Sequence, residues 1–296
     1  MTRPNRLVQA VIYLCGIALA LYIIAPFLWA LSASLRLESE IVVRPPNWIP
    51  SRPTVDNYIY VFTGKVPSGY AERGLLRSPI TQEARRLPQG LVNSLGVAVT
   101  VTLVNLFFGA LAAYSFARES FRGRSGAYSF ILGSRLLPPV AVAIPIYLII
   151  NQLDLLDTKT ALVLLHSAFT LPFTIWVLSL YFQSLPREVE DAALVDGCTR
   201  FGVLQHVVVP LATPGLAAVG AFAFLFSYSE FLFALFTTQT INAKTVPVLI
   251  SEVANNPDAS YTLIAVGIVL SIVSPIIFAV IFRRYITTGL AASLGK

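Results

Sequence analysis

The sequence has little charge for its length. Only 12% of its 296 residues are Asp, Glu, Lys or Arg, whereas 56% are hydrophobic and the mean hydropathy is +0.73. A soluble globular domain carries about 25% charged residues, so this chain has too little polar surface to cover a globule in water. The scarcity of charge therefore indicates an integral membrane protein.

Residues that commonly carry catalysis are also sparse. The only two histidines, His166 and His206, stand alone in the sequence, and we expect both to be packed or interfacial side chains. No G-x-x-x-x-G-K-[ST] phosphate loop occurs, and neither H-E-x-x-H nor G-x-S-x-G is present. The sequence thus argues against an intramembrane enzyme. We expect no directly bound cofactor or metal and an energy source supplied by a partner.

Cysteine is equally scarce. Cys15 lies in the first apolar run and Cys198 lies in a charged stretch far along the chain, so no disulfide is expected between them. The net charge of +6 is explained by orientation in a membrane and requires no nucleic-acid partner.

Six apolar runs are long enough to cross a bilayer, which takes about 20 residues of helix. They cover residues 7–31, 91–116, 128–150, 161–182, 207–236 and 263–282. The first run exceeds the apolar core of a signal peptide, about 7 to 15 residues, so we expect it to remain as an anchor. The sequence predicts an all-α integral membrane protein with six transmembrane helices.

The basic residues of the short loops predict the orientation. With the N-terminus inside, the inner loops hold ten of them: Arg3, Arg6, Arg118, Arg122, Arg124, Arg187, Arg200, Arg283, Arg284 and Lys296. The outer short loops hold only Lys159 and Lys244. Because Lys and Arg are retained in the cytoplasm, we expect both termini to be cytoplasmic. The expected parts are an anchor at 1–35, an extracytoplasmic loop at 36–90 and a core of five helices at 91–296, with a cytoplasmic tail at 283–296.

The longest charged interruption in the second half of the chain is residues 184–210. We expect Ser184 to cap a short helix whose acids lie in its first turn, near the positive end of the helix dipole. Gly197 should end that helix in a left-handed turn, and Thr199 should cap a second helix that enters the membrane. The face opposite the acids would consist of Val189, Ala192 and Ala193.

Seven residues of this stretch match a known spacing. Asp191, Ala192, Ala193, Gly197, Val207, Val209 and Pro210 resemble the Glu-Ala-Ala, Gly, Ile-x-Leu-Pro motif of ABC importer permeases, with conservative changes. The resemblance implies the fold of binding-protein-dependent ABC importer permeases, with a cytoplasmic coupling helix at about 184–206 that docks on an ATPase subunit. The implied coupling residues are Glu190, Asp191, Ala192, Ala193, Asp196 and Gly197. The alternative is an ordinary connector between two membrane helices.

Other stretches are similar to the carbohydrate branch of that family. They are residues 46–62, Asn93-Ser94, residues 145–172, and residues 283–292, which resemble the tail of the maltose-type inner-membrane subunit. Residues 63–86 look like an insertion with no assigned role. The resemblance implies a subunit of an importer for a sugar or sugar derivative in the bacterial inner membrane. Its implied partners are a second permease, a solute-binding protein and two ATPase subunits that use ATP and Mg.

An ion-gradient-driven secondary carrier is the alternative function. Such carriers usually show paired repeats and intramembrane carboxylates that bind the coupling ion. This chain shows one intramembrane acid and no repeat that we detect, which favours the importer subunit.

Two places in the apolar runs are candidates for the substrate pathway. Arg135 precedes a Pro138-Pro139 pair that should break its helix, although its side chain could equally extend to the cytoplasmic headgroups. The run from Ser227 to Leu235 resembles the Ser-Trp-Asn-Glu-Phe-Leu-Phe-Ala-Leu run of carbohydrate permeases, which makes Tyr228, Ser229 and Glu230 candidates. A carboxylate in an apolar helix needs a partner or a wet cavity. Alternatively, Glu230 lies near the outer interface and pairs with a neighbouring subunit.

Overall fold

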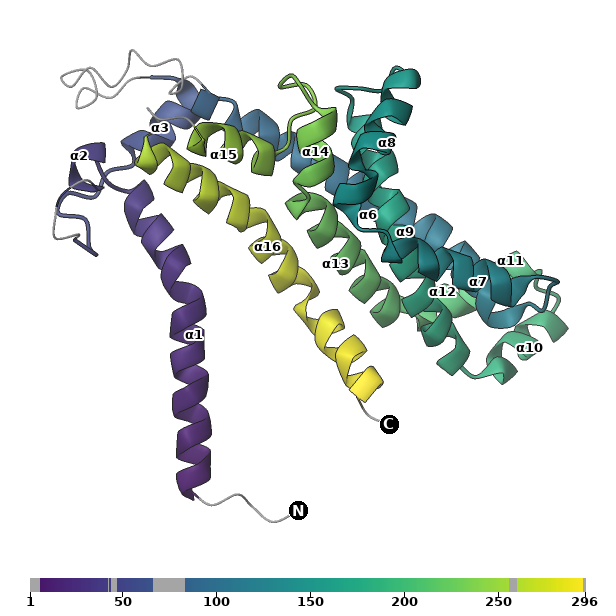
Figure 1. The fold of residues 1–296 in the computed structure, drawn as a ribbon. Helices are drawn as coiled ribbons and strands as arrows, with labels where there is room; N and C mark the ends of the chain where they lie inside the picture. The colour runs from purple at the N-terminus through teal and green to yellow at the C-terminus, as the bar shows by residue number, and fades with distance from the viewer. Residues whose placement is uncertain (1–5, 42, 44–46, 66–82, 256–259, 295–296) are drawn as a thin grey trace. The chain divides into compact units, whose positions relative to one another are not determined.

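The computed structural model describes residues 6–41, 43, 47–65, 83–255 and 260–294, with side chains described as far as Arg283. Within these ranges the only regular elements are helices. The chain forms two compact units, whose helices are labelled in Figure 1. The N-terminal unit is Met1–Pro88 with Leu249–Ile272, and the core unit is Gln89–Val248 with Val273–Lys296. Most of the expected insertion at 63–86 lies outside the described residues.

The N-terminal unit is built on one long apolar helix. Its helices are α1 (Arg6–Ser34), α2 (Glu38–Ile41) and α3 (Asp56–Thr63), together with the end of α15 (Val246–Ala254) and the start of α16 (Tyr261–Leu294). The side chains of α1 are apolar on all sides and exposed along most of the helix. A helix that is apolar all round is suited to lipid rather than to water.

Two polar side chains hold the N-terminal unit together at helix ends. The Asn57 amide of α3 donates to the backbone oxygens of Ser34 (2.8 Å) and Arg36 (2.7 Å), where α1 ends. The Glu38 carboxylate accepts from the backbone N–H groups of Tyr261 (2.9 Å) and Thr262 (3.1 Å), where α16 begins. Both side chains satisfy backbone groups that a helix terminus leaves without an intrahelical partner.

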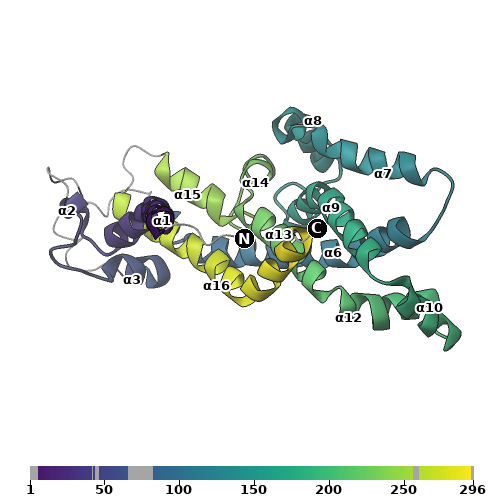
Figure 2. The ribbon, with the colours of Figure 1, turned by 90° about the horizontal axis from the view of Figure 1, so that it is seen from below.

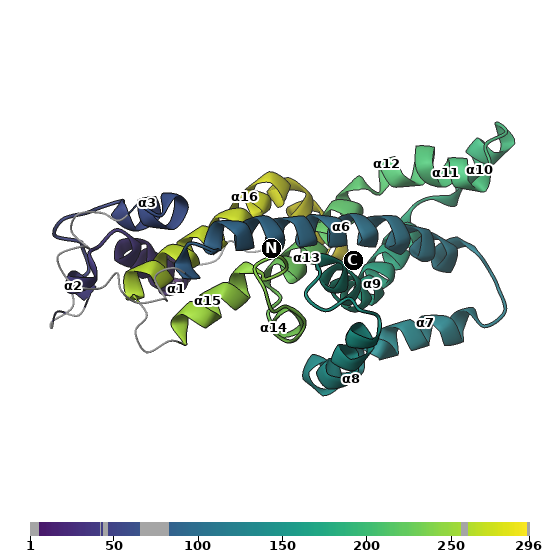
Figure 3. The same cartoon turned by 90° about the horizontal axis from the view of Figure 1, so that it is seen from above.

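The core unit contains the remaining helices. In chain order they are α6 (Leu87–Arg118), α7 (Arg124–Gly133), the 3-10 turn η2 (Ser134–Leu136), α8 (Pro139–Gln152), α9 (Lys159–Ser184), α10 (Arg187–Val195), α11 (Arg200–Val203), the π-helical η3 (Leu204–Val208), α12 (Val209–Leu211), α13 (Thr213–Ser229), α14 (Leu232–Thr237) and parts of α15 and α16. Figures 2 and 3 show α7 and α8 to one side of α9, and α10 to α12 to the other.

One buried apolar cluster of this unit forms where α6 and α9 meet α11, η3 and α13. Its buried residues are Ala110, Ala113, Ala117, Leu178, Phe182, Val203, Leu204, Val208, Ala212 and Val219. Small residues allow the helices to approach closely: a Cβ on Gly109 would lie 2.5 Å from Thr174 Cγ2, and one on Gly215 would lie 2.8 Å from the Tyr181 ring. Helices in membranes pack in this way because lipid provides no hydrophobic force between them.

Four of the six expected spans are continuous helices. They are α1, α6, α9 and the Tyr261–Arg283 part of α16. The other two are broken pairs: Arg124–Leu136 with Pro139–Gln152, bent by 101°, and Arg200–Leu211 with Thr213–Ser229, bent by 82°. Length and apolarity thus give four spans, or six if each bent pair is one span.

The break at Pro138-Pro139 was expected and is confirmed, whereas a continuous helix across 207–236 is the wrong expectation. The first break follows from the double proline: Leu137 and Pro138 are extended (ψ 118° and 131°), as expected for residues that precede proline. The run 207–236 bends at Ala212, just before the Thr213-Pro214 start of α13, and stops being helical again at Glu230 (ψ 133°). Proline at the start of a helix is favourable, so Pro214 starts a new helix where the apolar pattern alone continues the old one.

Candidate functional site

The turn at Gly197 has the predicted form. Gly197 has a φ of +91°, in the left-handed region that favours glycine. Its N–H donates to Leu194 O (3.1 Å), and the Cys198 N–H donates to Ala193 O (3.0 Å), which is the pattern of a helix ended by a Schellman motif. Thr199 then caps α11, because its hydroxyl oxygen accepts from Gly202 N at 3.1 Å.

The predicted start of the same segment is wrong. Ser184 belongs to α9, and its hydroxyl donates to the Tyr181 backbone oxygen (2.7 Å). Serine in the last turn of a helix can bond back to a carbonyl three residues earlier instead of capping the next helix. Helix α10 begins at Arg187 after Pro186 and has no side-chain cap at its start. The segment expected at 184–206 therefore consists of α10 and α11, followed by the π-helical turn.

The apolar face expected opposite the acids of α10 lies mostly at the surface of the chain. Val189 is 44% exposed and Ala192 is exposed, while Ala193 is half-buried. The one buried residue of α10 is Glu190, with 7% exposure. A carboxylate faces the bundle here because a guanidinium is there to receive it.

Glu190 is paired with Arg118, the last residue of α6. Arg118 places Nη2 2.6 Å and Nε 2.8 Å from Glu190 Oε1, and the Tyr114 hydroxyl donates to Oε2 at 3.1 Å. Arg118 also donates to the Leu185 backbone oxygen (3.1 Å), where α9 ends. The two charged side chains are 6% and 9% exposed. One guanidinium thus joins the ends of α6 and α9 to α10.

The outer surface of α10 carries the other candidate coupling residues. Asp191, Ala192 and Asp196 are exposed, and Val195 is 87% exposed. Arg200 of α11 forms an ion pair with Glu119 whose side chains are 67% and 40% exposed. Exposed pairs of this kind contribute about 0 to 1 kcal/mol. The segment is therefore held mainly by its buried pair and presents a mixed acidic and apolar outer face.

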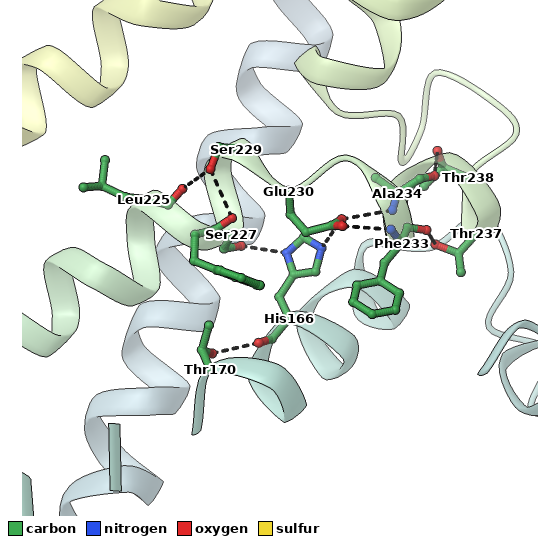
Figure 4. A network of polar contacts seen from close by, with 11 residues as sticks. His166, Thr170, Leu225, Ser227, Ser229, Glu230, Phe233, Ala234, Thr237 and Thr238 are labelled. Carbon is green, nitrogen blue, oxygen red and sulfur yellow. Dashed lines mark hydrogen bonds and ion pairs between the residues drawn. The ribbon is translucent and has the colours of Figure 1, made fainter. Parts of the chain in front are cut away.

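A second polar cluster lies at the break between α13 and α14 (Figure 4). His166 of α9 is fully buried; its Nδ1 lies 2.8 Å from the Ser227 hydroxyl oxygen and its Nε2 lies 3.1 Å from Glu230 Oε2. The Glu230 carboxylate also accepts from the backbone N–H groups of Phe233 (2.9 Å) and Ala234 (3.2 Å). Glu230 therefore caps α14 while it is paired with α9.

His166 is packed, as expected, but the sequence did not indicate its polar partners. It is the partner that a buried carboxylate requires, although 64 residues separate it from Glu230. Only one feature of the sequence pointed to His166. A carboxylate in an apolar helix requires a partner, and the sequence offers only two histidines for that role. His206, the other histidine, is exposed in the π-helical turn and bonds to Gly202 O (3.0 Å).

The other pathway candidates lie in different surroundings. Tyr228 is 3% exposed and stacks on Phe224 with ring centroids 5.9 Å apart, whereas Ser229 is exposed and donates to Leu225 O (2.6 Å). Arg135 is exposed in η2, with its guanidinium 5.8 Å from the centroid of the Phe173 ring. The structure thus brings Glu230 to His166 and Ser227, and places Arg135 on an aromatic ring of α9.

A latch joins the α8–α9 turn to the segment after α14. The Asp157 carboxylate accepts from the backbone N–H groups of Gln239 and Thr240, both at 2.9 Å, and from the Thr240 hydroxyl. Partial desolvation acts in the opposite direction, but these hydrogen bonds hold the pKa of Asp157 below its ordinary value. Among the described residues, no group of three or more His, Cys, Asp or Glu is arranged to hold a metal ion.

Comparisons with known proteins agree with this architecture. Residues 105–289 match the family described as binding-protein-dependent transport system inner membrane component. The chain is 34% identical to the sulfoquinovosyl glycerol transport system permease protein SmoH of Agrobacterium fabrum, over 90% of this chain and 87% of SmoH. It is 32% identical to the trehalose transport system permease protein SugB of Mycobacterium tuberculosis, over 93% of each chain.

The fold recurs in a solved structure. A bacterial ABC transporter involved in import of the acidic polysaccharide alginate contains a chain that matches with a TM-score of 0.77 at 20% identity, over 96% of this chain and 98% of that one. The expected resemblance to ABC importer permeases is confirmed. With its family match over residues 105–289 and relatives above 30% identity along nearly its whole length, the chain belongs to the binding-protein-dependent transport system inner membrane components.

Proposed function

We propose that the chain is the membrane-spanning permease subunit of an ATP-driven importer for a sugar or sugar derivative. The observation that carries this is the near full-length match to permeases named for carbohydrate transport, at 34% and 32% identity. A third relative, the trehalose/maltose transport system permease protein MalG of Thermococcus litoralis, matches over 99% of both chains at 28% identity. An ion-gradient-driven carrier loses its support, because the family is a binding-protein-dependent one.

The subunit would work in a complex. Its proposed partners are a second, related permease, two ATPase subunits that use ATP and Mg, and an extracytoplasmic solute-binding protein. The absence of a phosphate loop from the sequence supports a division of labour in which hydrolysis takes place on other chains. The substrate pathway would lie between the two permeases, and the chain itself performs no catalysis.

The coupling role falls to α10 and α11. Their outer face offers the exposed Asp191, Ala192, Val195 and Asp196, and the left-handed turn at Gly197 allows the chain to reverse directly behind it. Docking of this face on an ATPase subunit would draw α10 inward when ATP closes the ATPase dimer. The membrane helices would then open outward to receive substrate from the binding protein.

The proposed orientation places both termini in the cytoplasm of a bacterial inner membrane. The asymmetry of Lys and Arg among the short loops supports this. It puts α10 on the cytoplasmic side and the Asp157 latch on the outer side. Between them, Glu230 and Ser229 would line the proposed pathway, with Glu230 fixing the break between α13 and α14 and Ser229 offering an exposed hydroxyl.

The test is transport by the complete complex. The permease is co-expressed with the partners encoded beside it, purified and reconstituted in liposomes with its binding protein. A thermal-shift screen of that binding protein against sugars, polyols and sulfonated sugars first identifies the ligand. We expect uptake that requires ATP inside the vesicles and the binding protein outside. Uptake driven by a sodium or proton gradient without ATP would disprove the proposal.

A further inference from the structure

Helix α10 buries one side chain against the membrane helices, with Ala193 partly buried beside it. Helix α10 has nine residues, and its single buried side chain is that of Glu190. The connector between the end of α9 and the start of α10 is only Leu185 and Pro186, both in extended conformations (ψ 140° and 129°). A short extended connector would let α10 pivot unless a side chain fixes it.

The Arg118 guanidinium connects α6, α10 and the connector between α9 and α10. It belongs to the last turn of α6, it binds the Glu190 carboxylate through two nitrogens, and it donates to the oxygen of Leu185 within the connector. Both nitrogens bind Glu190 Oε1 and the Tyr114 hydroxyl binds Oε2, so the carboxylate is held at both of its oxygens. With both side chains at least nine-tenths buried, the pair is screened much less than an exposed ion pair.

Helix α6 is also attached at its other end. The Asn93 amide donates to the backbone oxygens of Ile241 (2.8 Å) and Lys244 (3.0 Å), and the Ser94 hydroxyl oxygen accepts from Val246 N (2.9 Å). Twenty-five residues of one continuous helix separate Arg118 from Asn93, which is roughly 37 Å at 1.5 Å per residue. A rigid element held at both ends can carry a displacement between them.

We propose that Glu190, Arg118 and Tyr114 form a positioning joint that makes α10 and α6 move as one body, so that a displacement of α10 reaches residues 241–246 through α6. This inference rests on the proposed coupling function and adds a role for the acid that faces away from the ATPase subunit. In this arrangement Asp191 contacts the ATPase subunit, and Glu190 transmits the displacement of α10 to α6. Neutralising Glu190 leaves a buried guanidinium without its counter-charge, which frees or distorts the joint.

The first test measures the joint directly in the assembled, reconstituted complex. Spin labels are placed on α10 and α6 through Glu188→Cys and Phe107→Cys, both at exposed positions, with Cys15 and Cys198 replaced by serine. With the joint intact, we expect one narrow distance that ATP does not change. With Glu190→Gln, we expect a broadened distance or one that shifts when ATP is added. A distance that stays narrow and fixed in Glu190→Gln contradicts the joint.

The second test separates transmission from assembly. In Glu190→Gln we expect transport to fall at least tenfold, while the ATPase subunits remain bound and hydrolysis stays within about threefold of the unsubstituted complex. Glu119→Gln is the matched control, because it removes an acid from an exposed ion pair next to the joint, and it should transport within twofold of normal. Equal transport by Glu190→Gln and Glu119→Gln would overturn the proposal.

Milder variants keep the test decisive if Glu190→Gln does not fold. Tyr114→Phe removes only the hydroxyl that donates to the Glu190 carboxylate, and should lower transport about twofold to threefold and broaden the label distance. Arg118→Gln combined with Glu190→Gln leaves no unpaired charge and should transport better than Arg118→Gln alone. Normal transport in Tyr114→Phe, with no such rescue in the double variant, contradicts the joint. An unsubstituted complex without ATP-dependent uptake would instead refute the proposed function.

Discussion

Glu190 and Glu230, two carboxylates of the core unit whose side chains are less than 10% exposed, are held in different ways. Glu190 faces a permanent cation, Arg118, and joins three helix ends. Glu230 faces a histidine and two backbone N–H groups at the start of α14. The first arrangement depends on charge and crosses between helices, so it is suited to transmitting force. The second combines one cross-helix contact, to His166 of α9, with two hydrogen bonds to the first turn of α14, so it is suited to fixing a local break in the backbone.

The largest effect should follow from removing the cross-helix pair. Glu190→Ala leaves the Arg118 guanidinium buried with only the Leu185 oxygen as an acceptor, and loss of one partner of a buried ion pair costs about 3 to 5 kcal/mol. Denaturant unfolding in detergent should show this loss. Glu119→Ala, in the exposed pair with Arg200, should change the unfolding free energy by less than about 1 kcal/mol. If the two variants lose similar unfolding free energies, the buried Arg118–Glu190 pair contributes no more to stability than the exposed Arg200–Glu119 pair.

A smaller and local effect is expected at Glu230. Glu230→Gln keeps one oxygen that can accept from a backbone N–H, but it loses the negative charge at the start of α14 and weakens the contact with His166. The amide hydrogens of Phe233 and Ala234 should exchange about tenfold faster, which corresponds to about 1.4 kcal/mol. Hydrogen exchange followed by mass spectrometry measures this. Equal acceleration throughout α9 and α13 would mean that Glu230 supports the whole bundle.

These sites show where reasoning from sequence succeeds. The Gly197 turn and the Thr199 cap follow from local backbone preferences, and both were predicted correctly. The long apolar runs likewise predict α1, α6 and α9, because the requirement for lipid contact acts on each helix alone.

The partners of the two acids could not be predicted in the same way. Arg118 and Glu190 lie 72 residues apart, and no periodicity links them. Read locally, Glu190 was one of several acids in a first turn, and Arg118 was one of several basic residues in a loop. Only the packing of α6 against α9 and α10 selects this acid and this arginine. The role of Ser184 failed for a related reason, since its hydroxyl could satisfy either of two helix ends.

A third prediction returns to the turn that ends α10. Gly197→Val places a branched side chain at a φ of +91°, which costs about 1 to 2 kcal/mol of backbone strain, and no atom lies within 4 Å of the new Cβ. The cost should therefore lie in the turn itself and not in packing. We expect normal membrane insertion, with transport reduced more than stability. Uptake at the normal rate would show that the turn is only a connector, whereas Gly197→Asn, which tolerates this conformation better, should be milder.

The smallest effect should appear at the Asp157 latch, where a third carboxylate is held almost entirely by hydrogen bonds from one neighbouring segment. Because its pKa is lower in the folded protein than in an unfolded chain, where it is about 3.9, the latch stabilises the fold above that value. This contribution is lost as the pH falls through the lower, folded pKa. The Gln239 and Thr240 amides should therefore lose protection from exchange, after correction for intrinsic rates, as the pH is lowered below about 4. In Asp157→Asn, protection at neutral pH should already be reduced and should then change little with acid. A variant that loses protection with the same pH profile as the unsubstituted chain would show that another group controls this segment.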